Sequence, residues 1–211
     1  MYRLINDYRD AICLRLADLD IAAYGELMKA LQSRGADATT SPHFQAAYRR
    51  YWRMNVARLG DLYYRRYFEL LADCWVSQST DIEAIVRDLA ETLEARTLQF
   101  SFATKLAHMV NPRLPVFDSF VAAFYFYTPP ASSNSFDQRL GDLLTFYRFL
   151  QAEYDRVTRD PAGSRMLAEV RNKLSLDLAV PDERVLDWLI WGLVSLLRER
   201  ARQRVEIQYR I

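Results

Sequence analysis

The scarcity of residues that break regular secondary structure is the feature that most constrains this fold. The 211-residue chain contains six glycines and seven prolines, and no Asn-Gly or Asp-Gly pair joins two runs of alternating apolar residues. Such turns are the strongest short signals for paired strands, and without them long segments of mixed apolar and charged residues favour helices. The sequence therefore predicts an all-α protein. Residues 1–211 suffice for one core, so we expect a single globular domain of about ten helices.

N-capping signals place the starts of several helices. Ser41 precedes Pro42, which suits the first helical position, and Thr80–Glu83 and Ser135–Gln138 match the capping box. The stretch 128–135 is rich in proline and serine, and it is either a hinge between two helical lobes with a cleft between them or an ordinary surface connection. Together with the apolar periodicity, these signals predict helices at residues 5–16, 17–33, 42–58, 60–77, 81–96, 99–110, 118–127, 135–159, 164–175 and 182–206.

Composition excludes several classes of protein. The net charge is +1, 51% of residues are hydrophobic and the mean hydropathy is −0.19, which disfavours a disordered or a globally basic chain. The most apolar run, Val185–Leu197, is shorter than the ~20 residues that cross a bilayer, and Met1–Ala11 lacks the apolar stretch of a secretory signal. Cys13 and Cys74 alone cannot build a disulfide framework. We therefore expect a cytoplasmic protein without membrane contact and, with two histidines in all, without a metal or cofactor.

The segment Gln99–Phe126 is the most informative part of the chain. Its helical repeat predicts a core face formed by Phe100, Ala103, Ala107 and Val110, and a polar stripe formed by Ser101, Thr104, Lys105, His108 and Asn111. Pro112 then ends the helix, because proline lacks the backbone donor and biases the preceding residue away from helical angles. An extended apolar connector, Pro115–Phe117, leads to Asp118 at the expected N-cap of the next helix.

Asp118 has two interpretations. As an N-cap it accepts hydrogen bonds from free backbone N–H groups and faces the positive end of the helix dipole. Alternatively, it is an ionised carboxylate at the mouth of a cleft beside Lys105 and His108. An amine, an imidazole and a carboxylate on one helix-loop-helix suit acid–base or nucleophilic chemistry. Asp118, Lys105 and His108 are therefore the candidate catalytic residues.

The order of an apolar helix with Lys105, a short loop and Leu114-Pro115-Val116-Phe117-Asp118 resembles the helix-hairpin-helix DNA glycosylases over Gln99–Phe126. The resemblance implies that Asp118 stabilises the sugar cation or activates the nucleophile, and that Lys105 is a candidate amine for Schiff-base formation. It implies an enzyme that flips a damaged or modified base from double-stranded DNA and cleaves its N-glycosidic bond, in repair or in defence against phages. The pattern FATK…NP…P…DS also resembles a group of uncharacterised bacterial proteins.

A second segment, His43–Phe68, carries six arginines against one acidic residue, Asp61, with five tyrosines and Trp52 interleaved. Arginines bind phosphates and aromatic rings stack on bases, so a nucleic-acid interface is one interpretation. An amphipathic helical hairpin with an aromatic core and solvated arginines is the other. A non-enzymatic module that binds nucleic acid or protein through this hairpin is the alternative to the glycosylase. The candidate nucleic-acid-binding residues are Arg49, Arg50, Arg53, Arg65, Arg66, Tyr51 and Trp52.

Two features of the C-terminal part leave alternatives open. Arg198–Arg210 carries five arginines against two glutamates, so it either contacts phosphates or is a solvated helix end. Asp187 lies among apolar residues, and a carboxylate there needs a partner to offset its desolvation. Asp187 is therefore either half of a buried ion pair or a site residue.

Overall fold

A computed structural model describes residues 2–17, 21–93 and 97–208, with side chains in the last helix up to residue 201. Within these residues the fold is all-α: it has eleven α-helices and no strands, and 78% of the chain is helical. This confirms the predicted fold class. Among the described residues, no helix combines the length and apolar character that crossing a membrane requires.

The chain divides into two compact units. The first comprises Met1–Leu19, Asp118–Thr128 and Glu153–Ile211, and the second comprises Asp20–Phe117 and Pro129–Ala152. The first contains α1 (Tyr2–Asp7), α2 (Arg9–Ala17), α8 (Ser119–Phe124), α10 (Pro161–Leu174), α11 (Asp182–Gln208) and the end of α9 (Phe136–Arg159). The second contains α3 (Ile21–Arg34), η1 (Gly35–Thr40), α4 (Pro42–Tyr51), η2 (Met54–Ala57), α5 (Asp61–Ser77), α6 (Ile82–Glu91), α7 (Phe100–Val110) and the beginning of α9.

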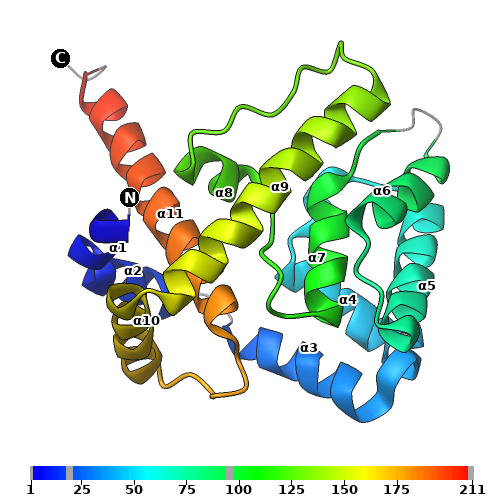
Figure 1. Cartoon of the computed structure of the whole chain (residues 1–211), viewed down its shortest axis with the longest axis horizontal. Helices are drawn as coiled ribbons and strands as arrows, with labels where there is room; N and C mark the ends of the chain where they lie inside the picture. Colours follow the sequence, from blue (N-terminus) through cyan, green and yellow to red (C-terminus); the bar gives the residue numbers. More distant parts are fainter. Residues whose placement is uncertain (1, 18–20, 94–96, 209–211) are drawn as a thin grey trace. The chain divides into compact units, whose positions relative to one another are not determined.

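In the first unit, α11 packs against α2, α8 and α10 (Figure 1). The close approach of α2 depends on Gly192, because a Cβ atom there would lie 2.7 Å from the side chain of Ile12. The same helix carries Asp187, which is buried, accepts a hydrogen bond from the Tyr154 hydroxyl at 2.5 Å and pairs with Arg184 at 3.4 Å. The predicted partner of this carboxylate is therefore present inside the first unit.

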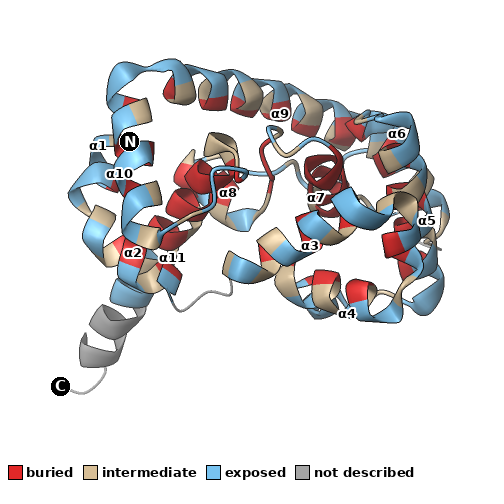
Figure 2. Cartoon of the chain, turned by 90° about the horizontal axis from the view of Figure 1, so that it is seen from below, coloured by how far each residue is buried: buried red, intermediate tan, exposed pale blue. Residues whose placement is uncertain are grey.

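In the second unit, α7 packs against α5 and α6 (Figure 1). Every residue of α7 except Ser101 is buried, and Figure 2 shows this helix buried along its length. The core face that the sequence predicts is present. Of the predicted polar stripe, Thr104, Lys105 and His108 are buried as well, whereas Ser101 is half-buried and Asn111, the C-cap residue of α7, is exposed. Polar groups on α7 must therefore find partners inside the protein.

Several predicted helix limits are confirmed and others are wrong. Ser135 and Gln138 form the expected capping box. Asp81, one residue after the predicted Thr80, caps α6 by accepting a hydrogen bond from Ala84 N. The helix predicted at 5–16 is divided into α1 and α2, and the one predicted at 42–58 ends at Tyr51. The helix predicted at 164–175 begins earlier, at Pro161, directly after its N-cap residue Asp160.

The chain passes from one unit to the other at four places, and one of them, between Thr128 and Pro129, lies at the start of the stretch interpreted as either a hinge or a surface connection. Hinge motion itself stays a prediction. The arginine-rich C-terminal segment Arg198–Arg210 begins inside α11, where Arg198 donates a hydrogen bond to the Ser119 carbonyl at 3.1 Å. From residue 202 onward its side chains lie outside the described residues.

Candidate functional site

Asp118 is the N-cap of α8. Its Oδ1 atom accepts hydrogen bonds from the backbone N–H groups of Phe120 at 2.8 Å and Val121 at 2.9 Å. The capping interpretation is thus confirmed. One oxygen makes both bonds, and Oδ2 has no hydrogen-bond partner among the described residues. Because the side chain is half-buried rather than enclosed, this second oxygen remains open to a ligand or to water.

Lys105 extends from α7 into the second unit. Its Nζ donates a hydrogen bond to the Trp52 carbonyl at 3.1 Å and lies 5.2 Å from the centre of the Phe102 ring. Trp52 is the C-cap residue of α4, so the ammonium group lies at the negative end of that helix dipole. Lys105 is 8% exposed. This environment suits a structural cation, which holds the end of α4 against α7.

His108 lies one turn further along α7 and is fully buried. Its Nδ1 is 2.6 Å from the Leu114 carbonyl, which can only accept, so Nδ1 carries the proton and donates. Its Nε2 is 3.0 Å from the Tyr24 hydroxyl, with which it forms a hydrogen bond. Both ring nitrogens are therefore engaged, and the ring fixes the connector that follows α7.

Thr104 completes the same pattern on α7. Its Oγ1 accepts a hydrogen bond from Phe117 N at 3.1 Å and lies 3.4 Å from the Phe117 carbonyl. The polar stripe thus ties the 111–117 connector and the end of α4 to one buried helix. Asp118 belongs to the first compact unit, whereas Lys105 and His108 belong to the second. The catalytic roles of all three residues stay predictions.

The aromatic residues of the arginine-rich hairpin form the core of the second unit. Trp52 is 5% exposed, and its ring lies 5.8 Å from that of His108. Tyr51 is half-buried and its ring lies 5.9 Å from that of Tyr24. The buried tyrosines of the hairpin are Tyr48, Tyr63, Tyr64 and Tyr67. The predicted aromatic core is confirmed, and these rings offer little surface on which a base could stack.

The arginines of the hairpin differ from one another. Arg66 forms a two-pronged ion pair with Asp88, with contacts of 2.7 and 2.6 Å, and lies within 4 Å of Glu69 and Asp73. These carboxylates raise the pKa of the Arg66 guanidinium and neutralise its charge. Arg49 packs its guanidinium 3.7 Å from the centre of the Tyr64 ring. Arg66 is therefore the weakest of the predicted phosphate ligands.

Three other arginines of this segment keep their charge at the surface. Arg50, Arg58 and Arg65 are exposed, and none forms an ion pair among the described residues. Arg53 is exposed as well. We call Arg50, Arg53, Arg58 and Arg65, together with the 52–60 connection between α4 and α5, the arginine turn.

A hollow of about 610 Å³ lies beside Arg49 and Arg65. It is also lined by the carboxylates Asp61, Glu69 and Asp73, which disfavour an anion there.

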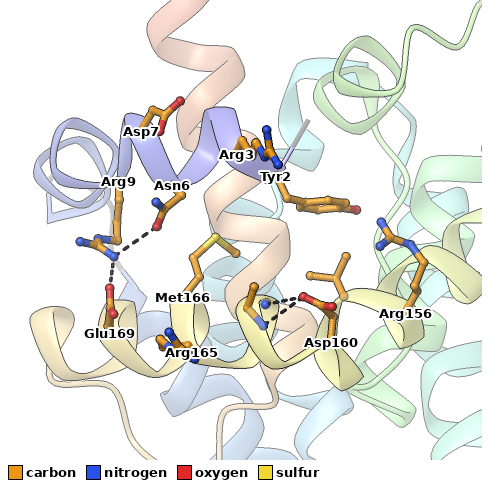
Figure 3. A pocket seen from close by; sticks show the side chains of 13 residues that line it. Tyr2, Arg3, Asn6, Asp7, Arg9, Arg156, Asp160, Arg165, Met166 and Glu169 are labelled. Atoms are coloured by element: carbon orange, nitrogen blue, oxygen red, sulfur yellow. Dashed lines mark hydrogen bonds and ion pairs between the residues drawn. The ribbon is translucent and has the colours of Figure 1, made fainter.

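The first unit contains a larger hollow, of about 910 Å³, which the sequence did not indicate. It is lined by α1, α2, α10 and the end of α9 (Figure 3). Arg9 bonds to Glu169 at one side, and Arg156 lies 5.5 Å from the Tyr2 ring at the other. Sequence reasoning missed this hollow because its walls come from both ends of the chain and no short motif spans them.

No known protein family, characterised protein or solved structure matches this chain. Among the described residues, no group of three or more histidine, cysteine, aspartate or glutamate side chains could hold a metal ion. Burial raises the pKa of the Cys74 thiol to about 11 and also raises that of Cys13, so neither is a reactive thiolate at neutral pH. The candidate sites are therefore the arginine turn and Asp118.

Proposed function

We propose that this chain binds nucleic acid through the arginine turn. The observation that carries the proposal is the exposure of Arg50, Arg58 and Arg65 without an ion pair among the described residues. Some exposed arginines elsewhere, such as Arg87 and Arg159, are paired with carboxylates, whereas the turn gathers several that are not. Guanidinium groups without carboxylate partners suit phosphate oxygens, which accept charge-assisted hydrogen bonds.

The buried aromatic rings determine the kind of binding we expect. Because Trp52 and the hairpin tyrosines belong to the core, contacts to phosphates dominate over stacking on bases. Binding through phosphates depends weakly on base sequence and strongly on salt. With three to four arginines engaged, the logarithm of the binding constant should fall by about 3 for each tenfold rise in salt.

A salt titration of DNA binding tests the proposal. We expect Arg50→Ala, Arg58→Ala and Arg65→Ala each to weaken binding of a short DNA duplex and to reduce the salt slope by about 1. Arg113→Ala is the matched control, since Arg113 is exposed in the same unit, lies outside the turn and forms no ion pair among the described residues. Equal losses in the control variant, or no binding by the wild-type chain at low salt, would refute the proposal.

Base excision at Asp118 is the second candidate function, and the second carboxylate oxygen favours it. Oδ1 alone holds the helix start, so Oδ2 has capacity for a sugar cation or an attacking water. Lys105 is buried and bonded to a carbonyl, so the chemistry at Asp118 would proceed by water without a lysine Schiff base. The proposed enzyme is therefore a monofunctional DNA glycosylase.

Asp118→Asn separates catalysis from capping, because asparagine caps a helix about as well as aspartate but carries no charge. The assay measures release of free base from duplexes that contain damaged or phage-type modified bases. We expect release by the wild-type chain, loss of release in Asp118→Asn and an unchanged unfolding midpoint. No release from any duplex, or full release by the variant, would exclude this activity and leave DNA binding untouched.

A further inference from the structure

Two residues of the arginine turn, Arg53 and Arg58, have a backbone conformation that is unfavourable for residues other than glycine. Arg53 has φ 52° and ψ 35°, and Arg58 has φ 50° and ψ 38°, so both lie in the left-handed region. Arg53 follows the C-cap of α4, a position where glycine costs least. A residue with a Cβ atom is strained there, because the Cβ atom approaches the following carbonyl oxygen. Both places nevertheless carry a large cationic side chain.

Three side chains of the second unit hold the turn, two of them by buried hydrogen bonds and one by an exposed one. Lys105 Nζ donates to the Trp52 carbonyl at 3.1 Å, and the Tyr64 hydroxyl donates to the Met54 carbonyl at 2.9 Å. Arg49 Nε donates to Asn55 Oδ1, also at 2.9 Å. These donors come from α7, α5 and α4, so three helices fix one short connection.

The middle of the turn presents an apolar side chain to solvent. Val56 is 81% exposed, although Met54, two residues earlier, is fully buried. Leu62, in the first turn of α5, is 63% exposed. A β-branched residue has few side-chain conformations, so Val56 projects from a rigid base as a short, stiff apolar tip between Arg53 and Arg58.

We infer that Val56 is a wedge that enters a groove of double-stranded DNA and unstacks a base step, while Arg50 and Arg58, which precede and follow it in the turn, bind the flanking phosphates. This inference rests on the proposed nucleic-acid binding of the same turn. An apolar side chain inserted between base pairs loses its contact with water, and cations on either side neutralise the phosphates of the bent duplex. A tip held by three helices avoids the ordering entropy that a mobile loop would lose on insertion.

Duplexes with 2-aminopurine at successive positions test the wedge, because this base becomes more fluorescent when it is unstacked. We expect the wild-type chain to raise the fluorescence at one step. Val56→Ala should abolish most of that rise and weaken binding by up to about tenfold, which corresponds to burial of one valine side chain. The salt slope should not change, since no charge is removed.

Val76→Ala is the matched control. Val76 lies at the end of α5 in the same unit and is 75% exposed. Salt-dependent binding without a fluorescence rise at any position, or the same rise with Val56→Ala as with the wild-type chain, would overturn the wedge and keep the phosphate interface. Binding to single-stranded DNA or RNA alone would also overturn it, and the absence of all binding would overturn both.

Discussion

Two neighbouring tyrosines of α5 give the sharpest test of how the second unit is held together. Tyr63 and Tyr67 are both buried, one helical turn apart, with ring centres 6.3 Å from each other. The Tyr67 hydroxyl donates to the Phe102 carbonyl at 3.1 Å and therefore accepts from the Tyr48 hydroxyl at 2.8 Å. The Tyr63 hydroxyl is buried and has no hydrogen-bond partner among the described residues.

Replacement by phenylalanine removes the same atom at both positions. Tyr67→Phe loses two hydrogen bonds worth about 1 kcal/mol each and leaves the buried Tyr48 hydroxyl without its acceptor, so we expect a loss of about 2–3 kcal/mol. Tyr63→Phe loses no hydrogen bond and relieves the desolvation of a buried hydroxyl. We expect that variant to be as stable as the wild-type chain or more stable by up to about 1 kcal/mol.

Urea unfolding followed by amide exchange in α5 and α7 measures the difference in the unit that contains both residues. The expected gap of about 2 kcal/mol or more corresponds to roughly a 30-fold difference in the unfolding equilibrium. Equal destabilisation by the two substitutions would show that ring packing, and not the hydroxyl network, decides the stability of this core. A larger loss for Tyr63→Phe would refute the hydrogen-bond assignment itself.

Three further perturbations follow from the first unit. Asp187→Asn removes a carboxylate charge that pairs with the buried Arg184 and should cost about 3–5 kcal/mol in urea unfolding. Asp10→Asn, at an exposed ion pair, should change stability little, and similar losses for the two variants would contradict the buried pair. Burial raises the pKa of the Tyr2 hydroxyl to about 12. As the pH rises, the unfolded state therefore loses the hydroxyl proton before the folded state does, and the free energy of unfolding should fall between about pH 10 and 12. The fall should be less steep in Tyr2→Phe. Ser175 ends α10 with φ 51°, so Ser175→Gly should raise the free energy of unfolding by about 0.5–1 kcal/mol, and a lower melting temperature would argue against strain there.

Local signals in the sequence predicted most of the helices because capping and chain breaking act within a few residues. The Ser135–Gln138 capping box and the Asp118 N-cap occur as expected. The errors arose where tertiary contacts overrode a local pattern. The helix predicted to continue to residue 58 ends at Tyr51, and the chain then takes a left-handed turn at Arg53, where Lys105 from a distant helix holds the Trp52 carbonyl.

The sequence by itself determined the all-α class, the aromatic core of the hairpin and the need of Asp187 for a partner, because periodicity, turn chemistry and desolvation are properties of short segments. Only the tertiary structure decided what the polar residues do. Lys105 and His108 look like catalytic groups on a helical stripe, yet both are buried and bonded to backbone carbonyls. The carbonyl that Lys105 binds belongs to Trp52, which is distant in the sequence, and the one that His108 binds belongs to Leu114, beyond the end of the helix. Arg66 and Arg58 are both basic in the sequence, and only the folded chain gives Arg66 a carboxylate partner and leaves Arg58 at the surface. The charge and chemical nature of a side chain follow from the residue type alone. Whether that side chain can contact a ligand depends on the residues that the folded chain places beside it.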